Sequence, residues 1–222
     1  MTSPESWLLW QLADSAFPAG GFAHSGGLEA AWRLGEVRTR KQLDEFIQSS
    51  LVQCGYGALP LLGQTHRDPA CLVEVDALAE AFLTNPVANR ASRAQGRAFL
   101  AASERAFACD AVSRIRKQIQ DDSIMGHFAP GFGVVMRLLE ISIENAQRLF
   151  LFLVLRGGVT GAVRLGILGP LEAQALQFRL APCAEDVLRR CGHLPLSALA
   201  QTAPVLDLLH AWRHAEHREH SH

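Results

Sequence analysis

Apolar residues return along this chain at helical spacing, and the stretch after Thr39 shows the pattern clearly. Thr39 and Gln42 form a capping-box pair, in which each side chain satisfies a free backbone N–H of the first helical turn. Apolar side chains then recur every three or four residues, which places them on one helix face: Leu43, Phe46, Ile47, Leu51 and Cys54. Asp68-Pro69 is expected to end this helix.

The same period predicts helices along the rest of the chain. They cover residues 72–83, 87–107, 112–119, 130–139, 142–155, 171–180 and 187–191, with a last helix from residue 204 onward. Alternation with a period of two, which would indicate strands, is not convincing anywhere. The sequence therefore predicts an all-α fold, a single globular domain of about eight to ten helices. We expect residues 1–212 to form this domain and residues 213–222 to form a flexible His-rich tail.

Composition narrows the class of protein. The chain has 222 residues, 49% of them hydrophobic, and a formal net charge of -1, so no basic surface points to nucleic acid or an anionic membrane. The apolar run 149–155 is a third of the ~20 residues that a bilayer span needs, so no membrane segment is expected. Residues 1–5 lack the features of a signal peptide, and the five scattered cysteines include no Cys-x-x-Cys pair. A cytoplasmic protein with free, buried thiols is expected.

The segment 17–29 is rich in glycine and is the first candidate for chemistry. Its paired glycines allow backbone angles closed to other residues, and Ser25 can cap a helix that starts near Gly26. It has neither the Gly-Lys-Ser/Thr ending of a P-loop nor Gly-x-Gly-x-x-Gly after a strand. A tight turn between packed helices is favoured, and a phosphate-binding enzyme site is the alternative. His24 has no Ser or Cys nucleophile beside it, so a structural role is favoured over a base.

Each of three later segments also allows two interpretations. Arg90, Arg93 and Arg97 share a helix face, which is either solvated or docks against an acidic partner. Gly96 in that helix hints at close packing. His127 is either the start of a helix or a partner contact. The glycines of 156–161 either let helices approach closely or break the apolar helix before them.

The end of the chain is rich in histidine. His210, His214 and His217 fall on one face of a helix if the helix extends that far, and His220 and His222 follow. Imidazole nitrogen suits nickel, copper and zinc, so His214, His217 and His220 are the candidate metal ligands. A histidine-rich tail also binds such metals weakly without a physiological purpose. The sequence therefore allows two interpretations, a functional metal site and incidental metal binding.

Residues 10–30 carry a resemblance to a known family. The run from Trp10 to Ala30 is similar to the opening of UreF-type urease accessory proteins. That family opening reads Leu-Gln-Leu-Ala, then Pro-x-Gly-Gly-Phe, and finally Gly-Leu-Glu, and this chain has Trp-Gln-Leu-Ala over 10–13. Three further blocks agree in order and spacing, 90–97, 127–134 and 155–166, and residues 204–207 resemble the family's last helix. The family's last helix runs to an aromatic and arginine-containing end, whereas this chain ends in His-Arg-Glu-His-Ser-His.

The resemblance implies a non-enzymatic, all-helical protein that forms a homodimer. It implies binding to UreD (also called UreH), to the GTPase UreG and to apo-urease, with GTP-dependent delivery of nickel. No firmly bound cofactor is implied, and nickel would be a transient cargo. The partner-binding candidates on matching positions are Phe17, Gly20, Gly21, His24, Glu29, Arg97, His127, Arg156, Arg164 and Asp207. A nickel-binding delivery protein that acts through the tail is the alternative function.

Overall fold

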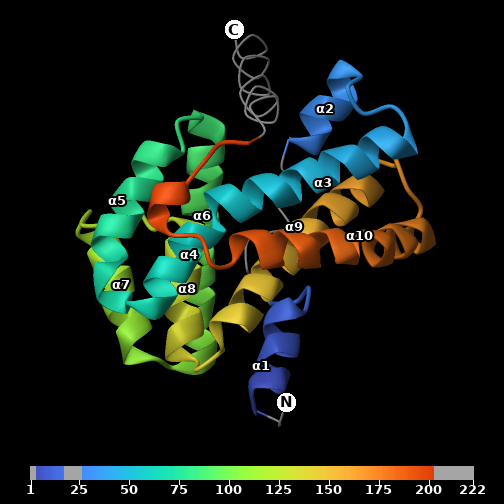
Figure 1. Ribbon diagram of the computed structural model, residues 1–222. Helices are drawn as coiled ribbons and strands as arrows, with labels where there is room; N and C mark the ends of the chain where they lie inside the picture. The colour runs from blue at the N-terminus through green and yellow to red at the C-terminus, as the bar shows by residue number, and fades with distance from the viewer. Residues whose placement is uncertain (1–3, 18–26, 203–222) are drawn as a thin grey trace, which may run out of the picture.

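The computed structural model describes residues 4–17 and 27–202, and these fold as α-helices joined by short turns (Figure 1). In order along the chain, the elements are α1 (Pro4–Ala13), α2 (Leu28–Leu34), α3 (Arg40–Gly57), α4 (Leu59–Arg67), the 3-10 turn η1 (Pro69–Cys71), α5 (Leu72–Phe82), α6 (Pro86–Phe107), α7 (Asp110–Gln120), α8 (Phe128–Leu138), α9 (Ile143–Arg164), α10 (Pro170–Cys191) and the 3-10 turn η2 (Leu196–Ala198). No strand occurs in these residues. The prediction of an all-α single domain is confirmed, whereas the boundary at residue 212 lies outside the described residues.

The helices form two groups that share one core. Figure 1 shows α4, α5, α6, α7 and α8 gathered at one end of the molecule, with α3, α9 and α10 packed together at the other. Leu59 and Leu62 of α4, with Phe132 of α8 and Leu149 of α9, are among the buried side chains that join the two groups. Burial of each such side chain contributes roughly 1.5–3 kcal/mol to folding.

The helix predicted from Thr39 to Asp68 is two helices. The capping box is confirmed, because the N–H of Gln42 donates to Thr39 Oγ1 at 3.2 Å and the N–H of Thr39 donates to Gln42 Oε1 at 3.0 Å. The chain bends at Ala58, and α4 begins there with Pro60 in its first turn, where proline's missing N–H leaves no bond unmade. The apolar period continues across the bend, so the pattern alone did not reveal it.

Two other helices are longer than predicted. α9 runs without a break through Gly157, Gly158 and Gly161, so the predicted alternative of a helix break is wrong. A Cβ on Gly158 would lie 3.2 Å from Ile47 Cγ1 of α3, which shows that Gly158 allows α9 to pack closely against α3. α10 contains Pro182 and joins the two short helices predicted over 171–180 and 187–191. Pro182 is exposed, so its ring projects to solvent and does not disturb the buried face of the helix.

α9 is long and apolar enough to cross a membrane by length and composition alone. Half of the qualifying stretch is buried, because α9 packs against α3, α10, α1 and α4. Among the described residues no other helix passes the same test. A core helix of a folded domain meets these criteria as readily as a span does, and the packing around α9 is that of a core helix.

The five cysteines are all free, as expected. Cys54 and Cys191 are buried between α3 and α10, and the others are half-buried. Burial, with a contribution from Cys191, raises the pKa of the Cys54 thiol to about 12. This thiol is therefore not a nucleophile at neutral pH.

Candidate functional site

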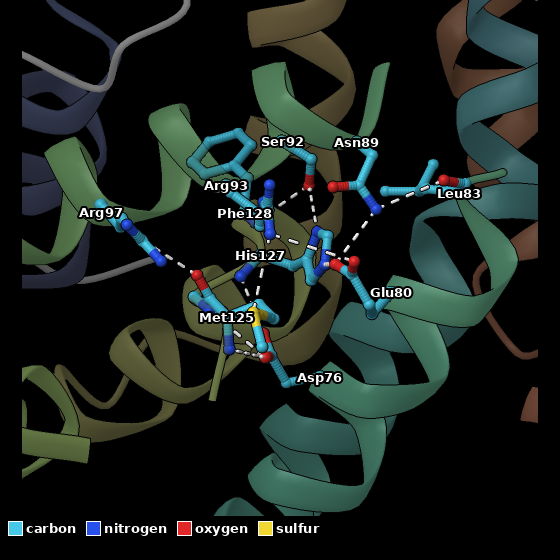
Figure 2. Close-up of polar contacts among 11 residues, drawn as sticks. Asp76, Glu80, Leu83, Asn89, Ser92, Arg93, Arg97, Met125, His127 and Phe128 are labelled. Carbon is cyan, nitrogen blue, oxygen red and sulfur yellow. Dashed lines mark hydrogen bonds and ion pairs between the residues drawn. The ribbon is translucent and has the colours of Figure 1, made fainter. Parts of the chain in front are cut away.

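Two of the blocks that carry the resemblance, 90–97 and 127–134, meet at the start of α8 (Figure 2). The turn before α8 is held by Asp76 of α5, whose side chain is 2% exposed. Its carboxylate accepts the backbone N–H groups of Met125, Gly126 (3.2 Å) and His127 (2.7 Å). Three successive N–H groups on one carboxylate make a charge-assisted anchor that fixes the turn before the helix begins.

His127 follows this anchor and is fully buried. Its Nε2 lies 2.8 Å from Glu80 Oε2 and its Nδ1 lies 3.1 Å from Ser92 Oγ. Because a carboxylate only accepts, Nε2 carries a proton and donates to Glu80, and Nδ1 meets the Ser92 hydroxyl. Ser92 Oγ in turn accepts the N–H of Phe128 at 3.3 Å, so each polar atom of this group has a partner.

Glu80 links the buried histidine to the surface. Its side chain is 40% exposed and accepts a hydrogen bond from Asn89 Nδ2 at 3.0 Å. Arg93 Nη1 lies 3.9 Å from its other oxygen. Partial burial favours the neutral acid, but the hydrogen bonds from Asn89 and His127 and the charge of Arg93 outweigh it, so the pKa of Glu80 lies below its usual value.

α6 crosses the same turn at its single interior glycine. A Cβ on Gly96 would lie 2.1 Å from the carbonyl oxygen of Gly126, so only glycine permits this approach. The next residue, Arg97, donates from Nε to the carbonyl of Met125 at 3.1 Å. The close packing predicted from Gly96 is confirmed. We call Asp76, Glu80, Ser92, Gly96 and Arg97, together with the turn 125–127 that they hold, the α8 clasp.

The α8 clasp has the residue types of a Ser-His-acid site, but its arrangement does not serve catalysis. A nucleophilic serine must face a substrate, whereas Ser92 Oγ is occupied by the N–H of Phe128. The His127 ring is 0% exposed, so no substrate atom reaches it in this conformation. The group fixes the start of α8. No cluster of three or more His, Cys, Asp or Glu side chains suited to a metal occurs in residues 4–17 and 27–202.

A second group of predicted residues meets at the turn after α1. Arg156 of α9 donates to the carbonyl of Ala13, which ends α1, and its guanidinium lies 5.5 Å from the centre of the Phe152 ring. Burial lowers the pKa of Arg156 from its usual value, and the charge of Asp14 opposes this shift. Arg156 therefore anchors the chain as it approaches the glycine-rich segment.

Phe17 joins this second group to the α8 clasp. Its buried ring stacks on Phe107 with centroids 6.0 Å apart and meets Phe99 edge-on at 6.2 Å. Phe99 in turn contacts Phe128 at 5.6 Å and Phe132 at 5.1 Å. A groove of about 740 Å³ runs beside Phe17 along the alanine-rich face of α6. The first residue of the glycine-rich segment thus belongs to the aromatic core under α8.

The other candidates lie apart from these groups. Glu29 of α2 pairs with Arg33 at 2.9 Å, and Arg164 is the exposed last residue of α9. α2 begins at Leu28 with Gly27 as its N-cap, so the predicted helix start near Gly26 is close, but Ser25 is not the cap residue. The remaining candidates lie outside the described residues: Gly20, Gly21, His24, Asp207, His214, His217 and His220.

Exposure separates the described candidates. Phe17 and His127 are buried, so their side chains are not on the surface of the folded chain. Arg97 and Arg164 are exposed and Arg156 is half-buried. That these residues contact a partner stays a prediction. The exposed arginines are the side chains that a partner can reach, so substitutions of exposed arginines test it.

Sequence reasoning missed Asp76 and Glu80, which organise the α8 clasp. A signal existed, because Asp76 is adjacent to Val75 and four residues from Leu72 and Glu80 on a helix whose apolar face is buried. A carboxylate beside the apolar face of a helix requires a partner that satisfies it. The partner lies about 50 residues further along the chain, and the helical period contains no information about it.

Comparison with known proteins shows which family model and which proteins this sequence is similar to. Residues 37–181 match the family model described as UreF. "Urease accessory protein F" of Oryza sativa subsp. indica is 35% identical over 213 residues, which cover 94% of this chain and 82% of the rice protein. The protein of the same name from Arabidopsis thaliana is 36% identical over 210 residues, covering 91% of this chain and 86% of its own length. "Urease accessory protein UreF" of Mycobacterium sp. (strain JLS) is 29% identical over 214 residues, covering 94% and 93%.

Proposed function

The chain belongs to the UreF family of urease accessory proteins, and we propose on that basis that it is a non-catalytic factor in the maturation of urease. In this proposal it binds UreD (or UreH), the GTPase UreG and apo-urease. It forms a homodimer, acts in the cytoplasm and regulates the GTP-dependent delivery of nickel. Nickel passes as cargo and is not a resident cofactor. The observation that carries the proposal is the family match, which extends from α3 into α10.

The geometry supports a binding role for the surface over the α8 clasp. The clasp fixes the turn 125–127 to α5 and α6, and so holds the exposed side of α6 in one position. Arg90 and Arg97 are exposed on that side, and the half-buried Arg93 lies between them. A guanidinium on a rigid helix suits recognition of carboxylates on a partner, because its planar set of donors matches a carboxylate and the helix backbone is already fixed before binding.

Co-purification from cells tests this proposal. The full chain is expressed with UreD, UreG and apo-urease, and the mass of the purified complex and the urease activity are measured. We expect a complex that contains UreD and UreG, with urease activity that depends on this chain. Absence of both partners from the purified chain, with the helical content intact, would overturn the assignment.

A charge reversal locates the surface. Arg90→Glu places a carboxylate on the exposed side of α6, outside the clasp, and is expected to weaken capture of a partner at least tenfold. Arg114→Glu on α7 is the matched control, since Arg114 is an exposed arginine on a helix outside the clasp. Equal loss of partner binding in both variants would contradict a role for the α6 surface.

A truncation tests the alternative of a nickel-delivering tail, and one substitution tests the alternative of a phosphate-binding enzyme. A chain that ends at Arg213 lacks His214, His217 and His220. Loss of urease activation at limiting nickel in this truncation would support a nickel-delivering tail, and unchanged activation would remove that idea. Turnover of a nucleotide by the isolated chain that His24→Ala abolishes would favour an enzyme instead.

A further inference from the structure

The outward face of α5 is apolar. Val73, Ala77 and Ala81 follow one another at spacings of four residues, and Leu78 lies beside them on the helix. All four are exposed, with Val73 at 44% and Leu78 at 37%. Glu74 is also exposed and is the charged side chain among them. We call Val73, Ala77, Leu78 and Ala81 the α5 face.

α5 meets the rest of the described chain through its other side. It packs against α4 and α8 with four buried residues, Leu72, Val75, Asp76 and Ala79. Figure 1 shows α5 at the outer edge of this group of helices. Folding of the described residues therefore leaves the α5 face in contact with water.

The described part of the chain ends beside the α5 face. Gln201 Nε2 donates to the carbonyl of Phe82, the last residue of α5, at 3.2 Å. The N–H of Thr202 donates to Gln53 Oε1 of α3 at 2.6 Å. Leu78 lies four residues before Phe82, on the same side of α5. Residues that follow Thr202 therefore start next to the C-terminal end of the α5 face.

The sequence of those residues has an apolar face of its own. Val205, Leu208, Leu209 and Trp212 fall at i, i+3, i+4 and i+7, the spacing of a helix that lays one side into an apolar surface. Asp207 falls on the opposite side of such a helix. Residues 203–222 lie outside the described residues, so this step rests on the sequence.

The lengths of the two apolar faces match. Val205–Trp212 as a helix and Val73–Ala81 of α5 each extend about 10–12 Å. The link from Thr202 to Val205 spans at most about 10 Å. Two packed helices have their axes about 8–10 Å apart, so the link is long enough to place Val205 against the end of α5.

We propose that residues 204–213 form a helix that packs antiparallel against the α5 face of the same chain. The direction follows because the segment starts at the C-terminal end of α5 and covers the face toward Val73. Arg213 then comes near Glu74, so the one charge on the covered side of α5 meets a charge of opposite sign. The short link holds the segment at an effective concentration of about millimolar, which favours it over a second copy or another protein.

The largest exposed apolar side chains lie elsewhere, on α10, but they are out of reach of the link. Phe178 is 85% exposed and is adjacent to Arg179, which pairs with Asp44 of α3 at 2.8 Å. Asp44 lies nine residues before Gln53, about 13 Å along α3 from the point where Thr202 is held. The α5 face begins at that point, and Phe178 does not.

Packing on α5 controls access to the segment. While it is docked, the side chains of Val205, Leu208, Leu209 and Trp212 are covered, and a protein that binds this apolar side must displace it from α5. Asp207 stays on the solvent side. The inference concerns contacts within one chain and does not depend on the proposed role in urease maturation.

Hydrogen exchange of the full chain, read by mass spectrometry, tests the surface. A helix of ten residues is marginal alone in water, so slow exchange of the amides of residues 205–213 requires packing. We expect wild type to exchange there at least about tenfold more slowly than an unstructured chain, and Ala77→Glu to remove this protection. Ala175→Glu, an exposed alanine on α10, is the matched control and should keep it. Circular dichroism should show the rest of the fold unchanged.

The proposal has clear contradicting results. Exchange of residues 205–213 in wild type at the rate of an unstructured chain would overturn it, as would equal protection in wild type and Ala77→Glu. Protection should be the same at ~1 µM and ~100 µM chain, because the contact is within one molecule. Protection that appears only at the higher concentration would assign the α5 face to a second copy and overturn the intramolecular contact.

A charge-reversal cycle tests the antiparallel direction. Glu74→Arg and Arg213→Glu should each speed exchange of residues 205–213 by about two- to fivefold, since each places like charges together. The double variant restores opposite charges and should recover the wild-type rate. If the double variant exchanges as fast as the product of the two single effects, Arg213 does not lie near Glu74 and the antiparallel packing is wrong.

Discussion

Gly96 and Gly126 are in direct backbone contact, and a Cβ on Gly96 would come within 2.1 Å of the Gly126 carbonyl oxygen. The obstruction is backbone, which cannot rotate away as a side chain can. Gly126 itself adopts a left-handed conformation with φ of +80°. The approach of α6 to the turn before α8 therefore depends on two glycines, one from each segment.

Replacement of Gly96 tests this contact. We expect Gly96→Ala to lower the free energy of unfolding by about 2–3 kcal/mol, because α6 or the turn must shift to make room. The measurement is urea unfolding followed by circular dichroism. Gly131→Ala is the matched control, since a Cβ there meets Leu100 Cδ1 at an ordinary 3.5 Å. The control should be neutral or more stable by about 0.5–1 kcal/mol, the usual gain from removing glycine in a helix. Equal destabilisation of both variants would contradict this account.

Asp76→Asn removes the anchor of the α8 clasp. An amide has one acceptor oxygen in place of two and carries no charge, so at least one buried N–H of residues 125–127 loses its partner. The expected loss of stability is about 2–4 kcal/mol. Hydrogen exchange should show faster exchange at Gly126 and His127, and Glu74→Gln, on the exposed side of α5, should leave both rates unchanged. Protection at these amides in Asp76→Asn equal to that in wild type would refute the anchor.

His66 makes the stability depend on pH. Its ring is 5% exposed, and Nε2 donates to the carbonyl of Ile141 at 2.8 Å. Burial lowers the pKa of His66, and the charges of Arg137 and Arg67 add to this effect against the Ile141 hydrogen bond. The unfolded chain therefore binds a proton more readily than the folded one, with a pKa of about 6.5 when unfolded.

Protonation of His66 lowers the stability of the fold at acidic pH. Stability is unaffected by His66 well above pH 6.5, where the ring is neutral in both states, and it falls as the pH is lowered through ~6.5 toward the lower folded pKa. His66→Gln keeps a donor for Ile141 and has no charge to gain. Between pH 7 and 5 the variant should lose less stability than wild type. Parallel stability curves for the two proteins would show that His66 does not titrate as described.

Glu5 of α1 holds the start of α9. Its Oε1 accepts the N–H of Ser142 at 2.9 Å, the Ser142 hydroxyl at 2.9 Å and Asn145 Nδ2 at 2.8 Å. Ser142 is in the N-cap position of α9, but its side chain makes no cap hydrogen bond, and the acceptor comes from another helix. The hydrogen bonds from Asn145 and Ser142 lower the pKa of Glu5, and the negative charge suits a helix N-terminus.

Glu5→Gln should reduce stability modestly at pH 7, by about 0.5 kcal/mol. Because the folded pKa is lowered, this contribution is present above the unfolded pKa of ~4.3 and disappears as the pH falls through the folded value. The difference in Tm between wild type and variant should shrink toward zero below pH 4. A difference that stays constant from pH 7 to pH 3 would show that the charge is not responsible.

The sequence by itself determined the features that depend on neighbours along the chain. The Thr39–Gln42 capping box and the helix over 87–107 are local, since each rests on residues within a turn or two of one another. The glycine-rich opening was sufficient to recognise the family, although most of that segment lies outside the described residues. Gly96 also signalled close packing, because a glycine inside a helix has a price that tertiary contact must offset.

Tertiary structure decided which predictions from local sequence patterns were correct. Proline usually ends a helix, yet α10 continues through Pro182 because its buried side chains on either side pack against α3 and α9. The meeting of Asp76 with residues 125–127 joins positions about 50 residues apart, and no helical period specifies such a pair. Whether His127 was a surface contact or a buried group depended on which helices surround it. Helical periodicity specifies which face of a segment is apolar, and the packing of that face against distant helices specifies which polar groups become buried with it.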